Sequence, residues 1–499
     1  MKCMQQKNLA NTNGALAAGG SSSSDTESLP AHSRRYTQYL AGGLATLAAL
    51  SSGTMLSWSS PGLALLQQPT STPHVTSDQA SWVGSLLNIG ALLGALPAGL
   101  LADRVGRRTT LIALGPLLVV SWLLVAFCTS VWELYAARLL GGAAVGAVSV
   151  VAPVYCVEVA ENSIRGALGS FFQLQLSVGI LLGYMAGFIS DTTTLALVLC
   201  SLPVIFLIAF PWVPESPAYL ASRGREQDAV TALLWLRGPR CDARAEARRL
   251  SAAHLRRDAD GGPSSHSPWR NLATSPTTRR ALLIAMGLMA FQQFSGVNAV
   301  IFYAEEILTI SDGRVSADAA CILVGAVQVA ANYASVLLVD RAGRRVLLLF
   351  SAIVMALSLG ALGAFFHFSS PGQPAGPISS ALPPLCLAGY IVAFSLGFGP
   401  IAWILLGELF APEAKGLAAA TGAACNWLSA FVVTRTFRDV RGALGSGPTF
   451  WLFSSVCLLA VPFVVLMVPE TKGRDLEEVQ EEMASGSRRK PVFAVSDAV

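Results

Sequence analysis

Long apolar runs separated by short polar segments dominate the chain. Twelve of these runs reach about 20 residues, the length that an α-helix needs to cross the hydrocarbon core of a bilayer. They lie near residues 38–60, 80–102, 109–128, 131–153, 167–189, 194–213, 281–303, 318–339, 346–368, 382–408, 416–437 and 449–468. Backbone inside a membrane must satisfy its own hydrogen bonds, so runs of this length predict helices. The pattern therefore predicts an all-α membrane protein with twelve transmembrane helices.

One long internal connection, 214–280, divides the runs into two groups of six. Its charged, helix-compatible pieces alternate with polar linkers that contain Pro and Gly, which favours short helices on a solvated face. The first 35 residues are polar and rich in Ser and Gly, so they are expected to be disordered. The predicted organisation is a cytoplasmic N-tail (1–35), a six-helix bundle (36–213), a cytoplasmic linker with short helices (214–280), a second six-helix bundle (281–470) and a cytoplasmic C-tail (471–499).

Charge is scarce and unevenly placed. Only 13% of the residues are charged, about half the usual share in a soluble protein. Of the 34 Lys and Arg residues, all but five fall in segments on one side of the predicted membrane. The exceptions are Arg314, Arg435, Arg438 and Arg441 on the other side and Arg138 inside the fourth run. Because cytoplasmic loops carry the excess of Lys and Arg, both termini are expected in the cytoplasm.

Acid–base motifs recur at the same cytoplasmic places in both halves. The matched sets are Asp103, Arg107 and Arg108 with Asp340, Arg344 and Arg345; Glu158 and Arg165 with Glu408 and Lys415; and Glu215 with Glu470. Their shared order predicts a duplicated six-helix unit with a pathway between the copies. Simple topogenic charge explains the bases but not the acids, which contribute little to orientation. We therefore predict a cytoplasmic charge network that pairs helix ends across the two bundles in one conformation and breaks in the other.

Three carboxamides lie inside the seventh run, at Gln292, Gln293 and Asn298. Each is expensive to bury without partners, and each suits a neutral partner covered in hydroxyls. On an unbroken helix Gln292 and Asn298 face different directions, so a shared site requires a break, for which Gly296 offers a place. The alternative is that the amides bridge neighbouring helices.

These motifs together resemble the sugar porters of the major facilitator superfamily over nearly all of residues 38–475. Within that family, the segments Gly397–Trp403, Asn426-Trp427 and Phe431–Thr434 are most similar to facilitated trehalose and glucose transporters. The resemblance implies a substrate site formed by Gln173, Gln292, Gln293, Asn298, Trp403 and Asn426, with Tyr303 as an outer gate. Gln328, Ser395, Ala218 and Lys415 depart from the family pattern, and Gln328 is a further candidate for substrate contact.

The resemblance implies sugar movement across the cell membrane, and coupling is judged from the first run. Residues 40–66 contain no Asp or Glu that a proton-coupled carrier would titrate, so passive uniport of trehalose or a hexose such as glucose is expected. The alternatives are a proton-coupled sugar or polyol symporter and, less favoured, a transporter-like sugar sensor. Buried Arg138 is expected to pair with an acid or with backbone carbonyls. No catalytic group, metal, cofactor or nucleic-acid partner is expected; the partners are sugar and lipid bilayer.

Overall fold

The computed structural model describes residues 34–260, 276–309, 316–368, 377–410 and 412–472, apart from 162, 190 and 240, together with 474, 478, 479, 482 and 483 near the C-terminus. The predicted disorder of residues 1–33, the linker piece 261–275 and the end of the C-tail lie outside this part of the chain. All regular elements of the described residues are helices.

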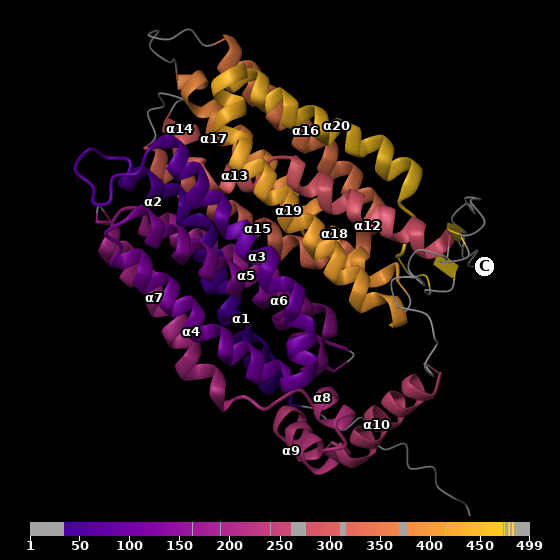
Figure 1. Cartoon of the computed structure of the whole chain (residues 1–499). Helices are drawn as coiled ribbons and strands as arrows, with labels where there is room; N and C mark the ends of the chain where they lie inside the picture. Colours follow the sequence, from indigo (N-terminus) through magenta and orange to yellow (C-terminus); the bar gives the residue numbers. More distant parts are fainter. Residues whose placement is uncertain are drawn as a thin grey trace, which may run out of the picture.

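The first half contains α1 (Arg35–Ser57), α2 (Ser59–Leu66), α3 (Ser77–Val105), α4 (Arg107–Ala126), α5 (Val131–Val159), α6 (Arg165–Ala186), α7 (Thr192–Ala209) and the 3₁₀ turn η1 (Phe210–Trp212). The helices α8 (Pro217–Ser222), α9 (Glu226–Arg237) and α10 (Ala243–Asp260) follow in the predicted linker. They lie together at one end of the first half (Figure 1).

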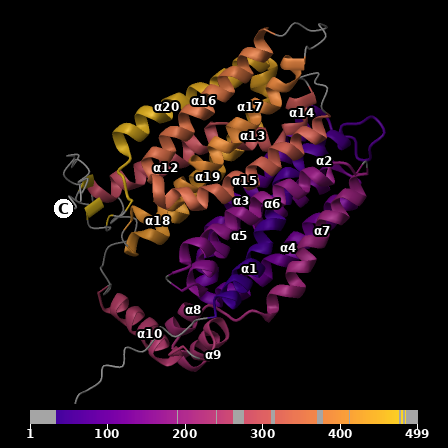
Figure 2. The ribbon, with the colours of Figure 1, turned by 180° about the vertical axis from the view of Figure 1, so that it is seen from behind.

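The second half contains α12 (Pro276–Phe294), α13 (Val297–Phe302), α14 (Ala304–Thr309), α15 (Ala317–Ala342), α16 (Arg344–Phe368), α17 (Pro377–Leu396), α18 (Phe398–Glu408), α19 (Pro412–Leu444) and α20 (Ser446–Met467). The two halves lie side by side as two groups of helices, seen from opposite sides in Figures 1 and 2. The helices α3 and α6 of the first half pack against α19 and α15 of the second.

Eleven segments of the described chain are long and apolar enough to cross a membrane, counting α1–α2, α12–α13 and α17–α18 as single segments. They correspond to eleven of the twelve predicted runs. The remaining run, 416–437, lies within α19, which is not among the eleven. Large apolar side chains stand exposed on the outer faces, among them Leu100, Ile208 and Leu357, which are each about two-thirds exposed. Such faces suit lipid tails rather than water.

In each half, a glycine at the same position of the repeat connects two consecutive helices. Gly106, between α3 and α4, has φ +109°, and Gly343, between α15 and α16, has φ +89°. Side chains rarely adopt this left-handed region, so glycine ends one helix and lets the next begin. A Cβ at Gly106 would also collide with the Glu215 carboxylate, and one at Gly343 would lie 3.0 Å from Glu470 Oε2. The sequence repeat therefore corresponds to a repeated backbone geometry.

Candidate functional site

A cluster of buried carboxamides joins α12, α13 and α19. Gln293 Nε2 donates to Asn426 Oδ1 at 3.0 Å, and Asn426 Nδ2 donates to Gln292 Oε1 at 2.6 Å. Asn298 Nδ2 donates to Gln293 Oε1 at 2.7 Å. All four side chains are at most 6% exposed. Four of the residues assigned to the substrate site from sequence thus lie in one hydrogen-bonded network, which we call the amide cluster.

The amide cluster depends on a break at Gly296. The helix α12 ends at Phe294, Gly296 has φ +94°, and α13 begins at Val297. A Cβ at Gly296 would lie 2.8 Å from the Phe453 ring, so both conformation and space favour glycine. The break turns the chain so that Asn298 reaches Gln293, as the spacing of the amides required. The predicted break is confirmed.

A second break lies beside the first. The helix α17 ends at Leu396 and α18 begins at Phe398, with Gly397 between them. Gln292 Nε2 donates to Phe398 O at 2.8 Å and to Gly399 O at 2.9 Å. The Gln292 amide therefore hydrogen-bonds the first two carbonyl groups of α18. Through it the amide cluster connects the broken segment α12–α13 to the broken segment α17–α18.

The other predicted site residues lie on separate helices. Gln328 on α15 is buried, whereas Gln173 on α6 and Trp403 on α18 are partly buried. Within the described residues, no side-chain hydrogen bond joins any of the three to the amide cluster. The structure thus joins four of the predicted substrate residues by hydrogen bonds, and these three are not part of that network among the described residues.

Around Tyr303, hydrogen bonds and an ion pair connect the two halves and hold α19 in place. Tyr303 Oη donates to Thr434 O at 3.2 Å, and Asn88 Nδ2 from α3 donates to Thr434 Oγ1 at 2.9 Å. Arg435 pairs with Asp78 of α3 at 2.8 Å. The Asn88 and Arg435 contacts join α3 to α19 across the boundary between the halves, and Tyr303, which belongs to the second half, bonds to α19 beside them. We call this set the α3–α19 seam.

Arg438 extends the α3–α19 seam. It pairs with Glu306 of its own half at 2.8 Å and donates to Ser77 O at 3.1 Å and to Gln67 Oε1 at 3.2 Å in the other half. Neither Asn88 nor these ion pairs were predicted from the sequence. An Asn inside an otherwise apolar run was the only available signal for Asn88, and nothing in the sequence indicates which distant acid each arginine meets.

The acid–base motifs pair within each half. Arg107 contacts Glu158 at 3.0 Å and Asp103 at 2.9 Å, and the Glu215 carboxylate accepts from the backbone N–H of Arg108 at 2.9 Å. In the second half, Arg344 contacts Glu408 at 3.1 Å, and Glu470 accepts from the backbone N–H groups of Arg344 and Arg345 at 3.0 Å each. The two sets have matching geometry.

The expectation of pairs across the two bundles is not met in this conformation. Every ion pair of these motifs between described side chains joins helix ends of one half. The Glu215 and Glu470 carboxylates are engaged by backbone amides at the matched glycine turns, where they also favour a helix N-terminus. Arg165 is exposed at the start of α6, and the side chains of Asp340 and Lys415 are outside the described set.

Arg138 is fully buried and bonded to backbone and hydroxyl oxygens. It donates to Val83 O at 3.1 Å, Met55 O at 2.9 Å and Ser59 Oγ at 2.6 Å. Its guanidinium also lies 5.1 Å from the ring centroid of Trp58, a cation–π arrangement. Of the two expected kinds of partner, the structure shows carbonyls. Arg138 thus holds the start of α2 against α1 and α3.

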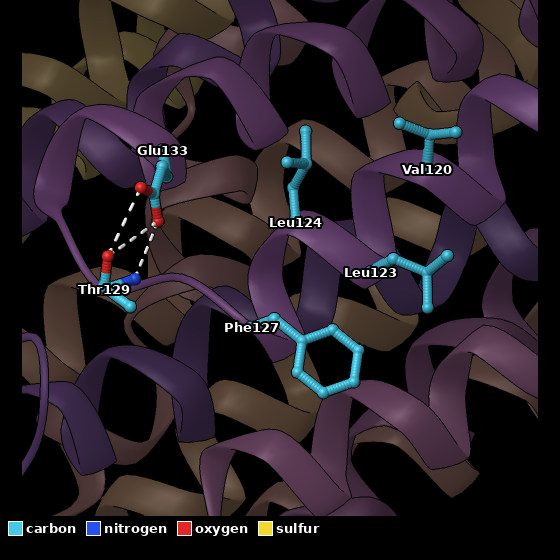
Figure 3. A pocket seen from close by; sticks show the side chains of 6 residues that line it. All are labelled: Val120, Leu123, Leu124, Phe127, Thr129 and Glu133. Atoms are coloured by element: carbon cyan, nitrogen blue, oxygen red, sulfur yellow. Dashed lines mark hydrogen bonds between the residues drawn. The ribbon is translucent and has the colours of Figure 1, made fainter.

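A separate cavity of about 460 Å³ lies where α4 ends and α5 begins. Figure 3 shows its apolar lining, with Glu133 turned toward Thr129. Glu133 Oε2 accepts from the Thr129 N–H at 2.7 Å and completes the cap of α5 with Ser130. Because helix capping already occupies this carboxylate, the cavity offers a sugar little hydrogen bonding.

The chain matches the model of the family described as sugar (and other) transporter over residues 32–483. It is 38% identical over 455 residues to a facilitated trehalose transporter of Drosophila yakuba, covering 91% of this chain and 53% of that protein. It is 36% identical to a facilitated trehalose transporter of Polypedilum vanderplanki, covering 91% and 89%. The chain thus spans only about half the length of the Drosophila yakuba relative.

Among solved structures, the inward open xylose transporter of E. coli resembles the chain with a TM-score of 0.74 at 26% identity, covering 89% of this chain and 99% of that one. A partially occluded inward open form of the same transporter gives 0.73, covering 88% and 100%. The family match covers most of the sequence, and the two halves with their broken helices are consistent with it. The chain belongs to the sugar transporter family of the major facilitator superfamily and is a multi-pass membrane protein.

Proposed function

We propose that the protein is a facilitative sugar uniporter, and not an enzyme, that moves trehalose or a hexose such as glucose across the cell membrane by alternating access. The observation that carries this proposal is the amide cluster at the junction of two broken helices. Carboxamides both donate and accept, so they match hydroxyls without requiring charge. Polar groups are expensive to bury inside a membrane, so a neutral polar cluster there is better explained by a substrate pathway than by packing alone.

The proposed site contains the amide cluster with Gln173, Trp403 and Gln328. In this conformation the cluster amides bond to one another, and a sugar entering the site exchanges those bonds for bonds to its hydroxyls. Trp403, partly buried on α18, offers an indole face to a sugar ring and an N–H to a hydroxyl. Gln173 and Gln328 approach from the helices that meet between the halves.

We propose a topology of twelve spans in two six-helix bundles, 36–213 and 281–470, with a cytoplasmic linker at 214–280 and both termini in the cytoplasm. The helix α19 supplies the twelfth span, since it has 33 residues and packs against α12 and α20. The concentration of Lys and Arg on one side supports this orientation. On this assignment the α3–α19 seam is external, and the structure is an externally closed state.

Gating follows from this assignment. The α3–α19 seam, with Tyr303 at its centre, separates when the external side opens. The cytoplasmic network of Asp103, Arg107, Arg108, Glu158, Arg165 and Glu215, with Asp340, Arg344, Arg345, Glu408, Lys415 and Glu470, rearranges when the cytoplasmic side closes. In the externally closed state, the bonds of this network lie within each half. In the externally open state, we expect some of them to be exchanged for bonds between the halves.

The main alternative is a proton-coupled sugar symporter. The E. coli relative is described as a proton:xylose symporter. Against this, α1 and α2, which form the first span, contain no Asp or Glu. The trehalose transporters among the relatives are described as facilitated. A transporter-like sensor remains the less favoured candidate.

Counterflow in proteoliposomes without an ion gradient tests the proposal. Liposomes preloaded with unlabelled trehalose or glucose should transiently accumulate the labelled sugar, and protein-free liposomes should not. Trehalose exchange supports a disaccharide uniporter, and exchange of glucose alone supports a hexose carrier. Net uptake against a sugar gradient that requires an imposed proton gradient selects the symporter. No exchange of either sugar by folded protein overturns the proposal.

A further inference from the structure

Asn332 on α15 is a buried amide without a hydrogen-bond partner in the described part of the chain. Its side chain is 3% exposed, and neither Nδ2 nor Oδ1 has a hydrogen-bond partner among the described residues. The four amides of the cluster each have partners within the protein. Buried amides nearly always have hydrogen-bond partners, so a buried amide without one is best explained by binding of a ligand or water. The family resemblance assigns no role to this position.

The depth of Asn332 matches that of the amide cluster. Ser335, three residues further along α15, donates to Leu396 O at 3.5 Å. Gln292 of the cluster donates to Phe398 O and Gly399 O. Both therefore attach to the same break between α17 and α18, from different helices. Three residues of helix rise about 4.5 Å, so Asn332 lies within one turn of that level.

The face of Asn332 points toward the other half. Gly325, two turns earlier on α15, packs so closely on α6 that a Cβ would lie 3.2 Å from Leu181 Cα. Residues seven apart share one face of a helix, so Asn332 continues the face that meets α6. On α6, Tyr184 Cδ2 would also lie 3.2 Å from that Cβ, and Gln173, eleven residues or about three turns before Tyr184, shares its face. In the proposed antiparallel arrangement of α6 and α15, this register sets Gln173 opposite Asn332.

We infer that Asn332 binds a hydroxyl of the transported sugar and forms the α15 wall of the substrate site, opposite Gln173 of the other bundle. This inference rests on the proposed function and deepens it. A carboxamide offers two donors and an acceptor, which suits adjacent hydroxyls on a sugar ring. Because Asn332 lies where the two halves meet, reorientation of the halves controls its access to substrate.

A cycle of sugar and protein changes tests the assignment. Counterflow half-saturation is measured for the parent sugar and for its series of monodeoxy analogues, with wild-type protein and with Asn332→Ala. For the hydroxyl that Asn332 contacts, removal weakens wild-type binding about three- to tenfold and has no further effect in Asn332→Ala. A purely structural role instead weakens every sugar by the same factor and leaves all analogue penalties in place.

Two further variants keep the result interpretable. Asn332→Ser retains a polar group and should retain part of the penalty for removing the contacted sugar hydroxyl. This variant serves as the test if the alanine variant folds poorly. Tyr333→Phe changes the adjacent residue, which is 61% exposed on the outer surface, and should leave the whole series unchanged. If wild type exchanges sugar and every analogue penalty survives in Asn332→Ala, the inference falls and the transporter stands. If wild type exchanges no sugar, both fall.

Discussion

Gln292→Leu is the most informative single change because Gln292 connects both broken helices. Its Nε2 donates to two backbone carbonyls of α18, and its Oε1 accepts from Asn426. Leucine is similar in size but makes none of these bonds. The substitution therefore tests both the substrate site and the stability of the two breaks.

The structure sets the expected size of each effect. A buried hydrogen bond contributes about 0.5–1.5 kcal/mol net, so three lost bonds lower the free energy of unfolding by about 1.5–4.5 kcal/mol. Loss of two bonds to the sugar, at the same magnitude, weakens binding by about 1–3 kcal/mol, or roughly 5- to 150-fold. Transport at low sugar concentration should fall by that factor even when the variant folds.

The assay separates these two effects. Thermal unfolding of the detergent-solubilised protein measures stability, and counterflow per folded transporter measures transport. Thr449→Val is a control, since it removes one partly buried hydroxyl bond at the start of α20, from Thr449 Oγ1 to Gly445 O of the N-cap. The control should lose a little stability and keep its half-saturation. Gln292→Leu protein with wild-type half-saturation for sugar would refute the placement of Gln292 in the site.

Three other predictions concern the seam, the buried arginine and external pH. Asp78→Ala removes the exposed ion pair with Arg435 and should raise the externally open population by a factor of about 1.4–5. The increase should appear as faster labelling of a Gly84→Cys reporter by an impermeant thiol reagent. Unchanged labelling would argue that this ion pair does not stabilise the externally closed state. Arg138→Lys should lower the free energy of unfolding by about 2–4 kcal/mol, because an ammonium cannot reach three oxygens in a fork; wild-type melting would contradict this. Burial, with the charge of Asp318, raises the pKa of Glu305 in α14 to about 7. The contribution of Glu305 to the free energy of unfolding should therefore be fully present below about pH 4.5 and be lost as pH rises to about 7. Glu305→Gln should flatten that part of the melting profile, and an equally steep profile in the variant would exclude Glu305 as its source.

Sequence reasoning located features that depend on local chemistry. A glycine among amides in an apolar run predicted the break at Gly296, because an unbroken helix sets Gln292 and Asn298 on different faces. A lone arginine in a span predicted burial with oxygen partners, and Arg138 has them. Eleven of twelve predicted runs correspond to candidate spans for the same reason: length and hydropathy act locally.

Pairing between distant residues was beyond that reasoning. Gln293 and Asn426 are 133 positions apart, and nothing in the sequence shows that they bond to each other. From the sequence, Arg435 was only counted among the few basic residues on the far side of the membrane, yet it meets Asp78 across the seam. The acids of the repeated motifs were expected to reach across the halves, but the glycine turns direct the Glu215 and Glu470 carboxylates onto backbone amides nearby. Which partner a charge selects depends on helix packing, which the pattern does not record.

The self-bonding of the amide cluster bears on how a uniporter completes its cycle. After releasing its cargo, such a carrier must return unloaded, and a site of bare donors and acceptors would resist that passage through a dry interior. Here Gln293, Asn426 and Gln292 satisfy one another through bonds within the protein. The return step therefore carries little desolvation penalty, and the protein should support net flux down a gradient at a rate close to that of exchange.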